Sequence, residues 1–305
     1  MWTVEGPHAG ALVTVDGLVP AAPEVRFPVA SLSKQFAAVA VLLLAERGAL
    51  ELHQPVSHWL PDGPPWWREA TLHHLLTHTS GTGHWEDAAG FDATATLSVE
   101  EYLALLATVE PRSRPGIRWH YSNPGYLMVA RIVEQAAGQP YTAFLSEHLF
   151  TPAGMGSTTT ARPDGTGTST ARGHRDGEPL PGGLPPRPGV RVWSTAGDLA
   201  RWTRALHTGD LLGWESRAVL TAPLAPTGEE RVLGRSFFGP HYGYGLYVGT
   251  VGNHRAYFHP GQNPGYLTFA AWLPEHHAAM VVLADDESAD LHGVIRQALA
   301  EAGLS

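Results

Sequence analysis

Apolar and polar positions along the chain predict several helices. Residues 31–47, SLSKQFAAVAVLLLAER, are almost entirely helix-forming and stop before Gly48, a residue type that commonly follows a helix end. Residues 98–108 and 125–137 show the apolar spacing of amphipathic helices that face a core. The longest apolar run, 36–45, is far short of the roughly 20 residues that cross a bilayer.

Strand-like patterns are concentrated near the end of the chain. In residues 257–285, YFHPGQNPGYLTFAAWLPEHHAAMVVLAD, two apolar runs flank a turn at 274–277. This pattern predicts an antiparallel hairpin whose first strand begins with residues 259–261. Residues 158–190 are instead dense in Gly, Pro and Thr without periodicity, which predicts a loop, either over a cleft or as a surface excursion.

Composition indicates a globular protein whose expected partners are small molecules or peptides. The 305 residues are 43% apolar and 16% charged, which suits one catalytic unit built from two lobes. A net charge of -9 argues against nucleic acid or an anionic membrane as a partner. The absence of cysteine excludes disulfides, thiolate metal sites and a cysteine nucleophile. The N-terminus lacks the pattern of a signal peptide, so we expect a cytoplasmic protein, or an exported one if a leader was trimmed. The oligomeric state is left open.

Lys34 is the only lysine among twenty basic residues. The abundance of Arg, Ala, Gly and Pro indicates a coding bias against lysine, so the one lysine that remains is informative. Arginine could supply a positive charge here but keeps its proton, so we expect this position to need an amine that can lose its proton. Ser31 lies three residues earlier, on the same face of the predicted helix. A hydroxyl at a helix start is close to backbone N–H groups that can stabilise an oxyanion. The pair therefore indicates an activated nucleophile, and the alternative is an ordinary N-capping serine.

A second polar cluster precedes the helix predicted at 125–137. Tyr121, Ser122 and Asn123 stand just before Pro-Gly, where a tyrosine and an amide could serve the same site as Ser31. The alternative is plain turn chemistry.

Other catalytic motifs are absent from the sequence. His74 and His78 have helical i, i+4 spacing, but no HExxH motif accompanies them, so we expect no metal. There is no GxSxG, GxGxxG or GxxxxGK motif, which argues against an α/β-hydrolase elbow and against nucleotide binding. We expect no cofactor.

Three short motifs together resemble those of the serine β-lactamase and penicillin-binding-protein superfamily, and most closely its branch of class C β-lactamases, D,D-carboxypeptidases, D-aminopeptidases and esterases. The family's SxxK, YxN and HxG motifs match residues 31–34, 121–123 and 259–261. The alternative third motif, KTG, cannot exist here because Lys34 is the only lysine. Further segments that resemble the family are 72–81, 150–158 and 192–202. In this resemblance His78 belongs to a framework turn and is a structural, hydrogen-bonded histidine.

The resemblance implies an α/β (α+β) fold of the β-lactamase/transpeptidase type. An antiparallel sheet flanked by terminal helices would be formed by about residues 1–60 with 230–305. A mostly helical lobe, 61–229, would be inserted between these parts, with the site in the cleft between the lobes.

The resemblance also implies a mechanism of acyl transfer through a covalent serine ester. Ser31 would attack a carbonyl, Lys34 and Tyr121 would take and relay its proton, and Asn123 would orient Lys34 and the substrate amide. Which of Lys34 and Tyr121 is the base is left open.

Further site residues are implied around this centre. His259 would line the cleft and contact the substrate or Tyr121, and Gly261 would adjoin the substrate. The backbone N–H groups of Ser31 and Gln262 would bind the oxyanion. Trp85, Tyr242, Tyr244 and Tyr257 are candidates for an apolar acyl pocket, with ordinary core positions as the alternative.

The expected function is a serine hydrolase of esters or amides, such as an esterase, a D-amino-acid peptidase or a β-lactamase-like enzyme. One alternative is an acyltransferase or transpeptidase that passes the acyl group to an amine or alcohol. The other is a β-lactam-binding sensor that acylates without turnover.

Overall fold

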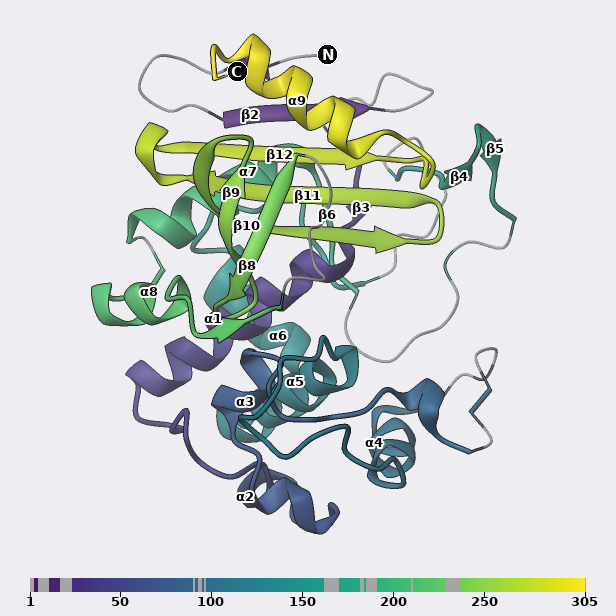
Figure 1. Cartoon of the computed structure of the whole chain (residues 1–305), viewed down its shortest axis with the longest axis vertical. Helices are drawn as coiled ribbons and strands as arrows, with labels where there is room; N and C mark the ends of the chain where they lie inside the picture. Colours follow the sequence, from purple (N-terminus) through teal and green to yellow (C-terminus); the bar gives the residue numbers. More distant parts are fainter. Residues whose placement is uncertain are drawn as a thin grey trace.

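A computed structural model describes residues 3–4, 11–16, 24–89, 91–92, 95, 97–161, 170–181, 184, 191–209, 211–228 and 236–304. A β-sheet with helices on both faces forms one part of the molecule, and a group of helices forms the other (Figure 1). This is the mixed α/β class that the family resemblance implies. None of the helices in these ranges is long and apolar enough to span a bilayer.

Within the described residues, the main sheet has eight strands in the order β1-β2-β12-β11-β10-β9-β8-β7. Neighbours pair antiparallel, except that β12 and β2 are parallel. The strands are β1 Thr3–Val4, β2 Ala11–Asp16, β7 Ala225–Pro226, β8 Phe237–Tyr242, β9 Tyr247–Val251, β10 His254–Asn263, β11 Tyr266–Leu273 and β12 Ala278–Ala284. Two short ladders pair β3 Phe27–Pro28 with β6 Trp193–Ser194, and β4 His174–Arg175 with β5 Glu178–Pro179.

The described helices occur in three groups along the chain: between β3 and β4, between β6 and β7, and after β12. They are α1 Ser33–Glu46, α2 Val56–Trp59, α3 Leu72–Leu76, α4 Val99–Ala107, α5 Asn123–Ala137, α6 Tyr141–Leu145, α7 Ala196–Thr208, α8 Trp214–Leu220 and α9 Leu291–Glu301. Single turns of 3₁₀ or π helix are η1 Ala30–Leu32, η2 Pro65–Arg68, η3 Trp85–Asp87, η4 Ser146–Phe150 and η5 Pro274–His276.

The sheet is covered on both faces. Met280 and Val282 of β12 join a hydrophobic cluster with Ile295 of α9, whereas Val281 and Leu283 join the cluster that contains much of α1 and α7. Figure 1 accordingly shows α9 in front of the sheet and α7 behind it. Since successive side chains of a strand point to opposite faces, burial of both faces explains why every residue of β12 is buried.

Helix α1 lies between the sheet and the helical part (Figure 1). Its residues from Lys34 to Leu44 are all buried, because α5, α6 and α8 contact it from different sides. A helix that is apolar around most of its circumference must be enclosed in this way. The turn η1, which leads into α1, contacts β10 and β11.

The helix predictions are largely confirmed. The segment predicted at 31–47 forms η1 and then α1, and Gly48 follows with φ +69°, as expected after a helix end. The amphipathic stretches form α4 and α5.

The hairpin prediction was wrong in one respect. The turn at its far end is present as η5, but residues 259–261 belong to β10, a separate strand that pairs with β11 through a tight turn at Pro264 and Gly265. Gly265 has φ +84°, a conformation that favours glycine, so Pro-Gly closes a second hairpin here.

The predicted loop at 158–190 contains the short pair β4–β5, and residues 162–169, 182–183 and 185–190 of it lie outside the described residues. A position over the cleft stays a prediction. The division into lobes near residues 60 and 230 also stays a prediction. Helix α7 lies within the predicted helical lobe, 61–229, but it packs on β11, β12 and β2 of the sheet.

Candidate active site

Ser31 lies in the turn η1, and hydrogen bonds with strand β11 and with the residue before β6 hold this turn in place. The Val29 N–H donates to the Val192 carbonyl at 2.9 Å, and the Thr268 hydroxyl donates to the Val29 carbonyl at 3.1 Å. Ala30 has φ +52°, in the left-handed region that is unfavourable for a residue with a Cβ. Backbone strain of this kind persists only where the surroundings enforce it, and it is common at functional sites.

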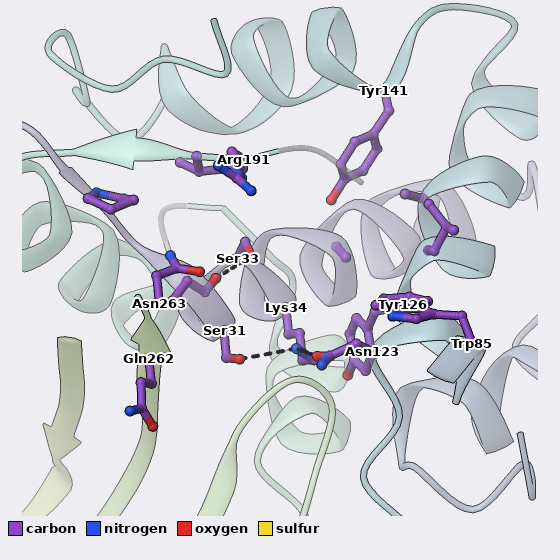
Figure 2. A pocket seen from close by; sticks show the side chains of 16 residues that line it. Ser31, Ser33, Lys34, Trp85, Asn123, Tyr126, Tyr141, Arg191, Gln262 and Asn263 are labelled. Atoms are coloured by element: carbon purple, nitrogen blue, oxygen red, sulfur yellow. Dashed lines mark hydrogen bonds between the residues drawn. The ribbon is translucent and has the colours of Figure 1, made fainter. Parts of the chain in front are cut away.

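Lys34 lies one helical turn after Ser31 and points to it (Figure 2). Its Nζ is 3.3 Å from Ser31 Oγ and donates to Asn123 Oδ1 at 2.8 Å. The side chain is buried, and this desolvation lowers the pKa of Lys34 from 10.5 to about 7. A substantial fraction of Lys34 is therefore an uncharged amine near neutral pH, which could accept a proton from Ser31.

Tyr121 approaches Ser31 from the helical part. Its hydroxyl donates to Ser31 Oγ at 2.9 Å, and Lys34 Nζ lies 4.7 Å from the centre of its ring. The serine oxygen is thus bracketed by an amine and a phenol. The structure brings together Ser31, Lys34, Tyr121 and Asn123 as the sequence analysis expected.

A buried histidine fixes the turn that carries Tyr121. The Ser122 N–H donates to His78 Nδ1 at 3.1 Å, and the Ser122 hydroxyl caps α5 by accepting the Gly125 N–H. The His78 ring packs on that of Tyr121, with 4.4 Å between their centres. His78 therefore has the structural, hydrogen-bonded role expected of it. His74, the other histidine of the pair, accepts the Thr71 N–H at the start of α3.

His259 does not line the cleft, contrary to expectation. It is 1% exposed, and its Nε2 lies 3.0 Å from the Tyr242 hydroxyl. Burial, aided by the charge of Lys34, lowers the pKa of His259 to about 3, although its hydrogen bond to the Pro260 carbonyl opposes the shift. The centre of the His259 ring lies 6.1 Å from the centre of the Tyr121 ring. His259 is therefore a buried neutral group beside Tyr121, and not a cation that faces the substrate.

Gly261 brings β10 close to the turn that carries Ser31. A Cβ at Gly261 would lie 2.3 Å from Thr268 Oγ1, 3.0 Å from the Val29 carbonyl and 3.1 Å from Ala30 Cβ. Only glycine fits between these atoms without movement. The next residue, Gln262, is among the residues that line the cleft (Figure 2), and its role as an oxyanion donor stays a prediction.

The cleft has a volume of about 180 Å³ and extends from Ser31 along one side of α1. Trp85 lines it, as expected, but Tyr242, Tyr244 and Tyr257 are not among its described lining residues. Tyr244 is a core residue whose hydroxyl lies 2.8 Å from His73 Nδ1.

Several cleft residues were missed by the sequence analysis. Tyr126, Leu127 and Ala130 lie on the face of α5 that Asn123 begins, so helical periodicity could have found them. Tyr141 and Arg191 come from distant segments, and no local pattern marks them (Figure 2).

Comparisons with known proteins agree with this geometry. The sequence profile of the Beta-lactamase family matches residues 7–304. Penicillin-binding protein 4* of Bacillus subtilis (strain 168) is 28% identical over 292 residues, which are 86% of this chain and 61% of that protein. Esterase EstB of Burkholderia gladioli is 36% identical over 152 residues, which are 45% of this chain and 38% of EstB.

A solved structure shows the same fold over most of the chain. The penicillin binding protein from Bacillus halodurans has a TM-score of 0.76 and 26% identity, covering 93% of this chain and 87% of that one. By contrast, the chain spans less than two thirds of the length of the two relatives above. The family match covers nearly the whole sequence. Residues of the SxxK and YxN motifs meet at the Ser31 hydroxyl, and Gly261 of the third motif packs against the turn that carries Ser31. The chain belongs to the Beta-lactamase family.

Proposed function

We propose that this protein is a serine hydrolase that cleaves ester or amide bonds through a covalent acyl-Ser31 intermediate. The observation that carries the proposal is the position of Ser31 Oγ, 3.3 Å from Lys34 Nζ and 2.9 Å from the Tyr121 hydroxyl. The relatives support it, since they include proteins named as an esterase and as penicillin-binding proteins.

The hydrogen bonds suggest a direction for proton transfer. Lys34 donates to Asn123 Oδ1, so the lone pair of its uncharged amine is available to Ser31. Tyr121 donates to Ser31 Oγ, which leaves the serine proton to point at Lys34. Ser31 then attacks the carbonyl carbon while its proton passes to Lys34 Nζ.

Tyr121 is placed to complete the acylation step. Its hydroxyl proton passes to the leaving alkoxide or amine as the carbonyl bond to that group breaks, and Lys34 returns a proton to Tyr121. Water, activated by the same pair, then releases the acid and restores Ser31. The backbone N–H groups of Ser31 and Gln262 are our candidates for binding the oxyanion of both steps.

Intact mass spectrometry tests the proposal directly. The wild type, Ser31→Ala and Ser33→Ala are mixed separately with benzylpenicillin and with p-nitrophenyl butyrate, and sampled from seconds to hours. Ser33 is the matched control because it lies two residues away and lines the same cleft. We expect one acyl group on the wild type and on Ser33→Ala with at least one reagent, and none on Ser31→Ala.

The lifetime of the adduct separates the possible activities. An adduct that decays with release of acid supports a hydrolase. An adduct that persists for hours with both reagents indicates a sensor and contradicts the proposal, as does equal acylation of Ser31→Ala. Product analysis with added methanol or glycine amide would reveal acyl transfer.

Substitution of Gly261 tests how closely β10 must approach the nucleophile. Because the new Cβ would overlap Thr268 Oγ1, we expect Gly261→Ala to destabilise the protein by about 1–3 kcal/mol. We expect acylation of Ser31 to slow by up to about a hundredfold, because a small displacement misaligns the reacting groups. Denaturant unfolding and the acylation rate measure the two effects.

Gly156→Ala is the control for this substitution. Gly156 has no neighbour within 4 Å of a built Cβ, so this variant should match the wild type in both measurements. If Gly261→Ala were acylated at the wild-type rate, close approach of β10 would not be required.

A further inference from the structure

Two histidines and a glutamate meet at the end of the sheet opposite the cleft. His254 begins β10, while Glu275 and His276 lie in η5, the turn between β11 and β12. One ligand atom from each lies within 4.8 Å of the other two. Since β10 is ten residues long, at about 3.3 Å per residue His254 is roughly 30 Å along the strand from Asn263 at the cleft.

The hydrogen bonds of His254 orient its ring as a ligand. Its Nε2 lies 2.9 Å from the Leu304 carbonyl, which can only accept, so Nε2 carries the proton. In the neutral ring the lone pair is then on Nδ1, and this atom lies 2.9 Å from His276 Nε2. A backbone carbonyl that fixes the tautomer of a histidine in this way is a usual feature of metal sites in proteins.

The separation of the two nitrogens suits a shared ion. Two imidazole nitrogens bound at about 2.0–2.1 Å with a tetrahedral angle lie about 3.3 Å apart. In the present contact of 2.9 Å His276 donates to His254. The contact would open by a few tenths of an ångström when the proton of His276 moves from Nε2 to Nδ1 and the freed Nε2 lone pair binds the ion. The side chain of His276 is exposed and can make this adjustment.

Glu275 can supply a carboxylate ligand without the loss of a strong interaction. Its Oε1 lies 3.7 Å from Arg255 Nε in an ion pair whose side chains are both at least half exposed. Exposed pairs of this kind contribute little to stability, so an ion can displace Arg255 from the carboxylate. Two imidazoles and one carboxylate favour zinc and similar transition ions over magnesium or calcium.

We propose that His254, Glu275 and His276 bind one divalent transition-metal ion, of which Zn²⁺ is the representative. The ion fastens the β11–β12 turn to the start of β10 and, through the Leu304 carbonyl, braces the segment that follows α9. This proposal departs from the expectation of no metal. No spacing motif in the sequence indicates the site, because His254 lies about twenty positions before Glu275 and His276.

Isothermal titration of the full chain, stripped with a chelator and then dialysed, tests the site with ZnCl₂. A double variant, His254→Gln with His276→Ala, should bind one equivalent of Zn²⁺ fewer than the wild type. His277→Asn is the matched control, because His277 is the adjacent exposed histidine and asparagine tolerates its φ of +48°. This control should keep the wild-type stoichiometry, and MgCl₂ should give no comparable heat.

Thermal unfolding provides a second readout. At a hundredfold excess of Zn²⁺ over the dissociation constant, the wild type should gain about 5 °C in Tm, and the double variant should lack this gain. Circular dichroism checks that the variants are folded. Equal binding by the wild type and the double variant, or no binding by the wild type at 0.1 mM Zn²⁺, on the order of a hundred times a micromolar constant, overturns the proposal.

Discussion

Replacing Lys34 with arginine should reduce kcat/KM for an activated ester by about a thousandfold while the nucleophile itself remains in place. Arginine keeps a positive charge and can donate to Asn123, but its guanidinium does not release a proton at accessible pH. General base catalysis typically contributes about 10²–10⁴-fold, and here the base also activates the nucleophile. The measurement is the pre-steady-state rate of Ser31 acylation, together with kcat/KM.

Lys34→Met tests whether Lys34 acts as a base or through its positive charge. If Lys34 acts as a base, the arginine and methionine variants should lose similar amounts of activity. If its charge were what mattered, arginine would retain far more. Arginine at this buried position also has no carboxylate to pair with among the described residues that line the cleft, so both variants need a check of folding. More than a tenth of wild-type activity in a folded Lys34→Arg protein would rule out the base role.

The activity should rise with pH and level off above about pH 7. Desolvation lowers the pKa of Lys34 to about 7, and the base form is the uncharged amine. Activity is therefore lost as pH falls through this value, by about tenfold per pH unit at lower pH. His259 should not add a second limb in this range, because burial lowers its pKa to about 3. A profile of log kcat/KM from pH 5 to 10 measures the midpoint.

Tyr121→Phe identifies the group that titrates. This variant should lower the plateau, because the proton donor to the leaving group is lost, but it should keep a midpoint near that of the wild type. Disappearance of the rising limb in Tyr121→Phe would assign the base to the tyrosine instead.

The same pKa shift links pH to stability. Between about pH 7 and 10.5 the unfolded chain holds a proton on Lys34 that the folded chain has lost. Stability therefore rises with pH across this window, by up to an amount on the order of 5 kcal/mol. Relative to Lys34→Met, which cannot titrate there, the wild type should become more stable from pH 7 to 10 in denaturant unfolding.

The parts of the site that sequence reasoning predicted well depend on local geometry. Ser31 and Lys34 are three residues apart on one helical segment, so their contact follows from the helix itself. Tyr121 and Asn123 are fixed by the start of α5, where Ser122 caps the helix. That these two segments meet was expected only from the resemblance of the motifs, because no local rule connects them.

The parts that were missed depend on which strands become neighbours. His259 and Asn263 are on the same side of β10 by alternation, but Tyr242 covers His259 while Asn263 reaches the cleft. Tyr242 comes from β8, which does not pair with β10 directly, since β9 lies between them. The Pro264 turn was overlooked although Asn-Pro-Gly is itself a turn signal, because residues 259–273 were assigned to a single strand.

The atoms of the proposed active site come from segments that are distant in the chain, and this separation would affect how the protein gains activity. Ser31 meets Tyr121 across 90 residues, and Lys34 meets Asn123 across 89. Non-local contacts of this kind close large loops and form slowly during folding. A partly folded chain, even one with α1 already formed, has a serine that is no more reactive than any other. Covalent labelling of Ser31 would therefore count only molecules that have reached the native state, and could follow their refolding in real time.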